Sequence, residues 1–296
     1  KRKNPQSTSK TAHPTAQCAV LRSASRMDKE AKTTTTGKQS QRKDRPHNAI
    51  SLPRRREKRK IIYMIRHGVA VHNVPDATTG EPPNQSDVRL TDPSLVPYGE
   101  RQVQMAGYIV RRDLKERAIE LVVSSPLTRC LQTSLLAFPP GGQNSSPVDE
   151  NTTYYCHEGV REAYGIHYPD KRRSVSSLRP LFPTFKFDSA MSDNDECWKP
   201  DKRESWSDVI ERVDNFFHWL STRPEKVVVI VSHGVWIETV LRWFCPLALG
   251  SDGRRRVYNA DVYRGEFVTS LEADQTDMHG ATRRTIQLQN VTLLKE

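Results

Sequence analysis

The sequence has few features of a secreted, membrane-spanning or metal-binding protein. It contains five cysteines, none of them in a CxxC pair, and an odd, scattered set suits free thiols in a reducing compartment. Its longest apolar run is Val227–Val231, far short of the roughly 20 residues needed to span a bilayer. The histidines show no ligand spacing such as HExxH. We therefore expect no membrane association, no metal and no cofactor, and the free thiols favour a cytoplasmic location.

Positive charge is concentrated at one end of the chain. The formal net charge is +11, but residues 1–60 alone carry 18 Lys and Arg against 4 Asp and Glu, a net of +14. The remaining 236 residues carry a net of −3, so we expect no nucleic-acid binding there and at most a weak polyanion contact by residues 1–60. The basic run Arg54–Lys60 fits a solvated linker better than a nuclear address, and the nucleus is the alternative location.

The chain divides into a tail and one domain. Residues 1–59 are rich in Lys, Arg, Ser, Thr and Gln, and their few apolar side chains cannot offset the entropy of ordering, which predicts a disordered basic tail. Residues 60–296 alternate apolar strands with amphipathic helices. This order predicts an α/β fold, a three-layer α/β/α sandwich with a mainly parallel central sheet. The expected strands are Lys60–Ile65, Ile119–Val123 and Val227–Val231, and the expected helices include Pro97–Leu114, one from Leu127, one from Ser205 and Val235–Phe244.

Two polar stretches interrupt this pattern. Pro139–Gly142 should end the helix that starts at Leu127, and a polar loop should run from there to about Asn151. The stretch Asp188–Glu204 is expected to be a mobile insertion outside the core.

The ends of the three predicted strands carry residues suited to phosphate. Arg66-His67-Gly68 follows the first strand, Ser124–Arg129 the second and Ser232-His233-Gly234 the third. Open α/β sheets bind ligands at the carboxyl ends of their strands. Each of these turns also leads to a helix start, where free N–H groups and the helix dipole favour an anion. The sequence therefore predicts a phosphate site at one edge of the sheet.

The residue types in these turns fit phosphoryl transfer without a metal. Arg66 and Arg129 can clamp phosphate oxygens with their planar forks. A neutral imidazole at His67 can attack phosphorus and form a phosphohistidine. His233, if protonated, could donate to the oxygens on which charge accumulates. A single RHG tripeptide means little, but two histidine turns with an arginine between them favour catalysis over structural roles.

These segments resemble the histidine phosphatase superfamily, the phosphoglycerate mutase-like proteins. The resemblance covers roughly residues 60–265 and depends on Tyr63–Gly68, Ser124–Thr133 and Val231–Gly234. It implies that His67 is the phosphorylated nucleophile and that Arg66, Arg129 and His233 complete the catalytic set. It further implies a phosphate contact by Asn73, in the pattern RHG-x4-N, and we count Gly68 among the substrate-binding residues.

The same resemblance points to an acidic residue as the general acid. Val160-Arg161-Glu162 matches best, which makes Glu162 the prediction and Glu158 its rival, with a surface carboxylate as the structural alternative. Such a carboxyl must donate a proton to the leaving oxygen and then activate water. Arg172 and Arg173 follow closely and could contact a second phosphate or carboxylate of the substrate, or form a solvated turn.

The predicted function is hydrolysis of a small phosphorylated metabolite. Val69 stands where many relatives carry Glu or Gln, and Asn73–Leu90 lacks the Gly-Trp-rich pattern of glycolytic mutases. The tract Arg66–Val74, together with Lys171–Ser174, resembles a eukaryotic phosphatase-type subgroup. The alternatives are a phosphoglycerate-type mutase, which returns the phosphoryl group to its product, and a catalytically weak protein that binds a phosphorylated ligand.

Overall fold

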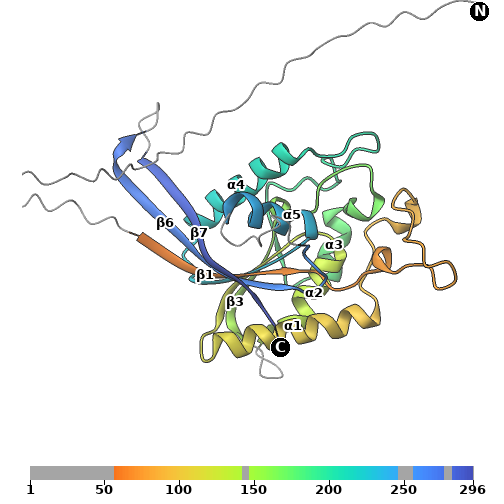
Figure 1. Ribbon diagram of the computed structural model, residues 1–296, viewed down its shortest axis with the longest axis horizontal. Coiled ribbons are helices and arrows are strands. Elements are labelled where there is room, and N and C mark those ends of the chain that lie inside the picture. Colours follow the sequence, from red (N-terminus) through yellow and green to blue (C-terminus); the bar gives the residue numbers. More distant parts are fainter. Residues whose placement is uncertain (1–56, 142–146, 246–255, 277–281, 296) are drawn as a thin grey trace, which may run out of the picture. The chain divides into compact units, whose positions relative to one another are not determined.

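The computed structural model describes residues 57–141, 147–245, 256–276 and 282–295 (Figure 1). Within these residues, one mixed sheet has the strand order β4-β3-β2-β5-β1-β6-β7. Its first five members in this order run parallel, while β6 is antiparallel to both β1 and β7. The strands are β1 Glu57–Arg66, β2 Ile119–Ser124, β3 Val148–Cys156, β4 Lys186–Phe187, β5 Val227–Ser232, β6 Val262–Thr276 and β7 Thr282–Leu294.

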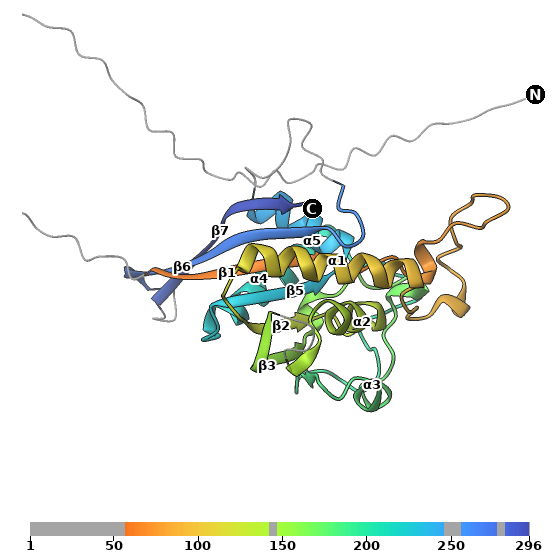
Figure 2. The same ribbon diagram turned by 90° about the horizontal axis from the view of Figure 1, so that it is seen from below.

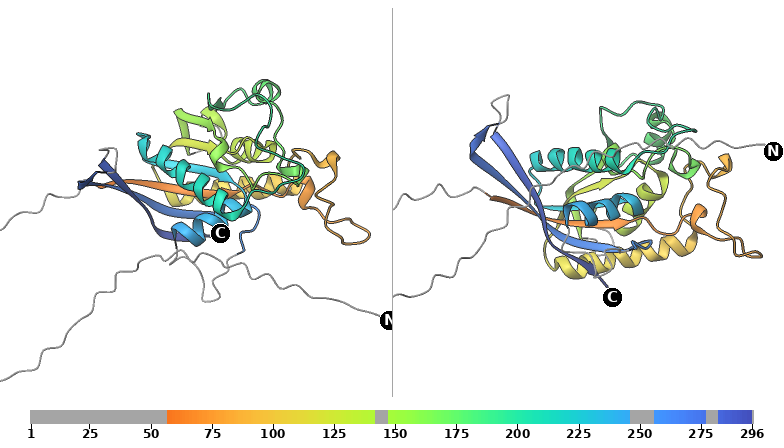
Figure 3. Two further views of the ribbon diagram at one scale, coloured as in Figure 1. Left: turned by 90° about the horizontal axis from the view of Figure 1, so that it is seen from above. Right: turned by 45° about the horizontal axis from the view of Figure 1, so that its top comes forward.

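Helices cover both faces of the sheet, as Figures 1 and 3 show. The helices are α1 Pro97–Leu114, α2 Thr128–Ala137, α3 Val175–Leu181, α4 Trp206–Thr222 and α5 Gly234–Thr239, which continues as a π-helical turn over Val240–Phe244. Among these described helices, none is both long and apolar enough to cross a membrane. The helix expected from Ser205 begins with a capping box, in which Asp208 N donates to Ser205 Oγ and Ser205 N donates to the Asp208 carboxylate.

The alternation of side chains along β1 explains the three layers. Tyr63 and Ile65 pack into a core cluster with residues of α1 and α2, whereas Ile62 and Met64 pack into a second cluster with residues of α4 and α5. Successive strand residues point to opposite faces, so a strand that is apolar at every position must be covered on both sides. The predicted three-layer α/β/α arrangement is confirmed.

The structure extends the predicted sheet at both edges. Strand β1 begins at Glu57, three residues before the expected start at Lys60, while the rest of the predicted tail lies outside the described residues. Strand β3 begins at Val148, inside the predicted polar loop. The sequence does not reveal this start, because exposed polar side chains such as Asp149 and Glu150 hide the alternation typical of a strand. Strands β6 and β7, which lie beyond β1 in Figure 2, were not predicted either.

The stretch Asp188–Glu204 is also anchored more firmly than the sequence suggests. The Asp195 carboxylate forms an ion pair of 2.6 Å with Arg161, in which the side chains are 1% and 0% exposed. Trp198 is buried, and its indole N–H donates to the carbonyl of His167 at 2.9 Å. The expectation of an insertion without core contacts is therefore wrong for these residues.

The register of the sheet brings the three motif-bearing turns together. Arg66 lies opposite Ser232 in the β1–β5 pair, and Ser124 lies opposite Val231 in the β2–β5 pair. The carboxyl ends of β2, β5 and β1 are therefore neighbours, with β5 in the middle. This is the edge at which the sequence predicts the phosphate site.

Candidate active site

The structure holds His67 as a neutral imidazole, and a contact at each ring nitrogen fixes which of the two carries the hydrogen. The side chain is buried, and Nδ1 lies 2.8 Å from the carbonyl oxygen of Gly68, while Nε2 accepts from Arg129 Nε at 3.2 Å. Nε2 accepts a hydrogen bond and Nδ1 faces a carbonyl oxygen, so the hydrogen of the neutral ring lies on Nδ1. Burial, then the charges of Arg129 and Arg66, hold the His67 pKa well below its usual range. Nε2 is thus the unprotonated nitrogen, and its lone pair accepts the hydrogen bond from Arg129.

Arg129 connects the other groups of the site. Its guanidinium is 1% exposed; besides His67 it donates from Nη1 to the carbonyl of Pro169 at 2.5 Å and from Nη2 to Asp170 Oδ1 at 3.0 Å. The same Nη2 lies 3.2 Å from His233 Nδ1. A buried guanidinium this well anchored is pre-organised for an anion. The structure therefore brings Arg129, His67 and His233 together, as predicted.

His233 sits beside the nucleophile in a form different from the protonated one considered above. The two imidazole centroids lie 5.1 Å apart. Nδ1 faces the Arg129 guanidinium, so hydrogen belongs on Nε2, which lies 2.8 Å from Ser125 Oγ. Burial, with the nearby charge of Arg129, keeps the His233 pKa well below its usual range. Without an anion, His233 is therefore neutral.

Glu162 and Arg66 lie next to each other at the start of α5. Glu162 Oε2 accepts from the Val235 N–H at 3.3 Å, and the guanidinium of Arg66 lies 3.6 Å from the position of a Cβ built on Gly234. Arg66 donates from Nη1 to the carbonyl of Val257 at 2.7 Å. Burial, then the charge of Asp170, raises the Glu162 pKa. A raised pKa lets a carboxyl hold its proton to a higher pH, which suits a general acid.

Glu158, the rival candidate for the general acid, pairs with two arginines. Its carboxylate lies 2.8 Å from Arg161 Nη1 and 2.8 Å from Arg172 Nε. A carboxylate that two guanidiniums hold in this way is not free to reach a leaving oxygen. The geometry favours Glu162 over Glu158.

Gly68 has a positioning role, so its prediction as a substrate-binding residue needs correction. Its N–H donates to Thr133 Oγ1 at 3.2 Å, and its carbonyl holds His67 Nδ1. An added Cβ would lie 2.5 Å from the carbonyl oxygen of Gly99 in α1. Only glycine allows this close packing, and neither of its backbone groups is left for a phosphate.

Asn73 ends a 3₁₀ turn and faces a segment that sequence reasoning missed. Its Oδ1 accepts from Ala70 N at 3.1 Å and from Asn259 Nδ2 at 3.3 Å. Asn259 Nδ2 also donates to the carbonyl of His67 at 3.0 Å, and Ala260 N donates to that of Arg66. The Asn73 oxygen is thus used by the turn, and only its amide N–H groups could contact a phosphate.

Two buried carboxylates that position Arg129 were also missed. Asp92 caps α2 by accepting from Thr128 N at 2.7 Å and from Thr128 Oγ1 at 2.6 Å, directly before Arg129. Asp170 accepts from Arg129 and from Arg203 Nη1, the latter at 2.8 Å. Neither residue lies in an identifiable motif, because each acts through a contact between segments distant in the sequence.

Arg172 does not have the substrate-binding role that the sequence predicts for it. Its side chain is 1% exposed, and besides Glu158 it donates to four backbone carbonyls, those of Arg173, Ser192, Asp193 and Asn194. These donors hold the segment around Asp193 and are not free for a substrate, so the substrate-binding role is wrong for Arg172. Arg173 differs: its side chain is 45% exposed and lies 3.4 Å from Asp92, which keeps it a candidate.

Replacing these two neighbouring arginines should separate the two roles. Arg172→Ala is expected to lower the free energy of unfolding by about 3–5 kcal/mol, because it removes one of the two arginines that pair with Glu158 and leaves four backbone carbonyls without their donor. Arg173→Ala should cost about 1 kcal/mol or less, yet raise KM about tenfold if Arg173 binds an anionic group of the substrate. Urea denaturation and steady-state kinetics measure these quantities. An unchanged KM in Arg173→Ala, with every ester tested, would contradict the binding role.

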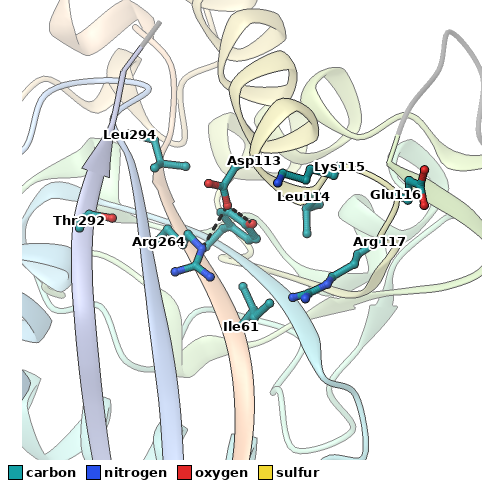
Figure 4. A pocket seen from close by; sticks show the side chains of 10 residues that line it. Ile61, Asp113, Leu114, Lys115, Glu116, Arg117, Arg264, Thr292 and Leu294 are labelled. Atoms are coloured by element: carbon teal, nitrogen blue, oxygen red, sulfur yellow. Dashed lines mark hydrogen bonds and ion pairs between the residues drawn. The ribbon is translucent and has the colours of Figure 1, made fainter.

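A cavity of about 670 Å³ lies apart from these residues, between the end of α1 and strands β1, β6 and β7. Figure 4 shows the Asp113 carboxylate inside it, bonded to the hydroxyl of Tyr63 at 2.6 Å and to Arg264 at 3.1 Å. No member of the histidine–arginine set lines this cavity. Within the described part of the chain, no group of three or more His, Cys, Asp or Glu could hold a metal ion.

The fold and the paired histidines define a phosphate-handling α/β protein. Residues 62–271 match the model of the histidine phosphatase superfamily (branch 1), and the chain belongs to this superfamily. A phosphoglycerate mutase-like protein of Arabidopsis thaliana is 32% identical over 205 residues, which cover 62% of this chain and 74% of the relative.

One further relative, and one solved structure with a similar fold, carry names of phosphatases. A broad-specificity phosphatase of Saccharomyces cerevisiae is 28% identical over 197 residues, covering 62% of this chain and 69% of that protein. Among solved structures, the ecdysone phosphate phosphatase from Bombix mori in complex with tungstate is 14% identical, with a TM-score of 0.47, covering 76% and 92% of the two chains.

Proposed function

We propose that this protein is a metal-independent phosphatase that hydrolyses a small phosphomonoester through a phosphohistidine on His67. The observation that carries this proposal is the buried, neutral His67, with its Nε2 lone pair turned to Arg129 and its Nδ1 hydrogen bound to the Gly68 carbonyl. A structural histidine would have no need of an anchored guanidinium at its free nitrogen.

In the first step, His67 Nε2 attacks phosphorus and the bond from phosphorus to the ester oxygen breaks. Arg66 and Arg129 compensate the charge on the phosphoryl oxygens. Glu162 gives its proton to the leaving oxygen, which departs as an alcohol. The negative phosphoryl group also raises the pKa of His233 and favours its protonated form, which would donate to a phosphoryl oxygen.

In the second step, the ionised Glu162 takes a proton from water, and the oxygen of that water attacks phosphorus. The bond from phosphorus to Nε2 breaks, its electron pair returns to His67, and inorganic phosphate leaves. Glu162 is again protonated. One ester and one water thus become one alcohol and one phosphate, and no redox partner or metal is required.

A mutase would use the same residues but return the phosphoryl group to its product. The phosphatase is favoured because the tract Asn73–Leu90 lacks the mutase pattern and because a relative of similar coverage is named a broad-specificity phosphatase.

The free thiols support a cytoplasmic location.

The test is phosphate release with EDTA present, from p-nitrophenyl phosphate and from a panel of sugar and glycerate phosphates. We expect release from at least one ester, with loss of the phosphoester from the product. Conservation of the phosphoester in an isomeric product would show a mutase instead. Folded protein that turns over no ester would refute the proposed hydrolysis.

A further inference from the structure

His72 is a third imidazole at the catalytic cluster, and the mechanism above does not use it. It lies in the 3₁₀ turn Val71–Asn73, and its ring centroid is 5.8 Å from that of His67, with the planes tilted by 45°. Nothing in a metal-free mechanism built on one nucleophile and one acid requires a further histidine so close to the nucleophile. Its surroundings show what it could do.

Two buried polar atoms of the site have no hydrogen-bond partner. Among the described residues, four buried side-chain nitrogens lack one, and they are His72 Nδ1, Arg66 Nε, Arg161 Nε and Arg172 Nε. The last two belong to guanidiniums whose other nitrogens are hydrogen-bonded, and Arg172 Nε forms an ion pair of 2.8 Å with Glu158 Oε1. A buried nitrogen without a partner costs free energy, because it has given up its hydrogen bonds to water. Such a cost at His72 and Arg66, on either side of the nucleophile, indicates a ligand that supplies the missing acceptors.

The charges around His72 identify that ligand as an anion. Burial, then the positive charges of Arg129 and Arg66, lowers the His72 pKa to about 2, so His72 is neutral when no anion is bound. A neutral imidazole can still donate one N–H. A tetrahedral oxyanion between the arginines would offer several acceptors to the unpartnered nitrogens.

We propose that His72 is a substrate-contacting residue, whose Nδ1–H donates to an oxygen of the bound phosphoryl group beside His67. This inference deepens the proposed phosphatase function and rests on it. It assigns His72 to the same oxyanion that Arg66 and Arg129 neutralise. It also accounts for the turn Val71–Asn73, which places His72 against the nucleophile while Asn73 closes the turn on Ala70.

The test is calorimetric binding of inorganic phosphate and of orthovanadate, which needs no turnover. His72→Phe keeps a planar ring but has no donor, and should weaken binding by roughly 10- to 100-fold. His72→Asn places an amide N–H₂ as many bonds from Cα as Nδ1 is; it should bind at least about fivefold more tightly than His72→Gln, whose amide lies one carbon further out.

Gln85→Ala is the matched control. Gln85 Nε2 donates to the backbone carbonyl of His72 at 3.2 Å, so this variant disturbs the turn and leaves the imidazole. We expect its phosphate Kd to stay within about twofold. If His72→Phe does not fold, the phosphate Kd values of His72→Asn and His72→Gln decide whether His72 contacts the phosphoryl group.

Three outcomes would overturn the inference: an unchanged Kd in His72→Phe, an equal loss in Gln85→Ala, or equal binding by the Asn and Gln variants. The proposed function can fail separately. Wild-type protein that binds phosphate through His72 but hydrolyses no ester would refute the phosphatase and leave the phosphate contact standing.

Discussion

Replacement of His67 by alanine is expected to lower kcat for phosphomonoester hydrolysis by about 10⁴- to 10⁶-fold, as removal of a nucleophile does in other covalent enzymes. The size follows from the geometry. His67 is buried, its tautomer is fixed by Gly68, and Arg129 lies at Nε2. No other described imidazole has this combination: His233 Nδ1 faces Arg129 while its Nε2 faces Ser125.

The measurement combines steady-state rates with trapping of the intermediate. Rapid quenching with a ³²P-labelled ester should leave label on wild-type protein that is stable to alkali and labile to acid, as a phosphohistidine is. The label should be missing in His67→Ala. His218→Ala is the control, because the His218 side chain is 51% exposed on α4 and, among the described residues, forms an ion pair only with Asp214, at 3.5 Å. Activity and labelling in His218→Ala should match the wild type.

An active His67→Ala protein would exclude the phosphohistidine route. The variant must be shown to fold, and thermal unfolding provides that check. The substitution removes a buried ring, so about 3 kcal/mol of lost stability is expected from the cavity alone. A fall in activity without unfolding therefore reports the nucleophile.

The sequence predicts the centre of this fold better than its edges, for a physical reason. The apolar stretches Ile62–Ile65 of β1, Leu121–Val123 of β2 and Val227–Val231 of β5 are buried between the two helical layers, and helix α1 was predicted with its observed bounds. Strand β3 starts with three exposed polar residues, Asp149 to Asn151. Strand β4 pairs with β3 only at Tyr155 and Cys156, so the start of β3 lies at an open edge, where exposed polar residues are tolerated and make the strand look like a loop.

The prediction of the catalytic residues was likewise successful only in part. His67, Arg129 and His233 lie in turns next to buried strands, so short motifs locate them. Asp170 and Asn259 are found only in the structure, since each contacts the set from a segment far away in the sequence. Arg172 shows the opposite error, because a basic residue near a phosphate motif looks like a ligand until its four carbonyl partners are seen.

Glu162→Gln is expected to lower kcat by about 10²- to 10³-fold for alkyl phosphates, the usual worth of a positioned general acid. With p-nitrophenyl phosphate the loss should be below about tenfold, because that leaving group departs as an anion without a proton. The ratio of the two losses is the quantity to measure. A merely structural role for Glu162 would lower both rates alike.

The pH dependence tests the same group independently. Burial and Asp170 raise the Glu162 pKa, so the protonated acid persists to a higher pH than an exposed glutamate would allow. Hydrolysis of alkyl phosphates should therefore fall as pH rises through this raised pKa. A glutamine has no proton to lose, so that descending limb should be absent in Glu162→Gln.

Glu158→Gln is the control that separates the acid from its neighbour. Glu158 lies between Arg161 and Arg172, so its replacement weakens a buried ion pair and should lower the free energy of unfolding by about 3 kcal/mol. It should leave the dependence on the leaving group and the pH limb in place. If instead Glu158→Gln removed the limb and Glu162→Gln kept it, the acid would be Glu158. The carboxylate would then have to leave both arginines during turnover, a rearrangement that the present contacts disfavour.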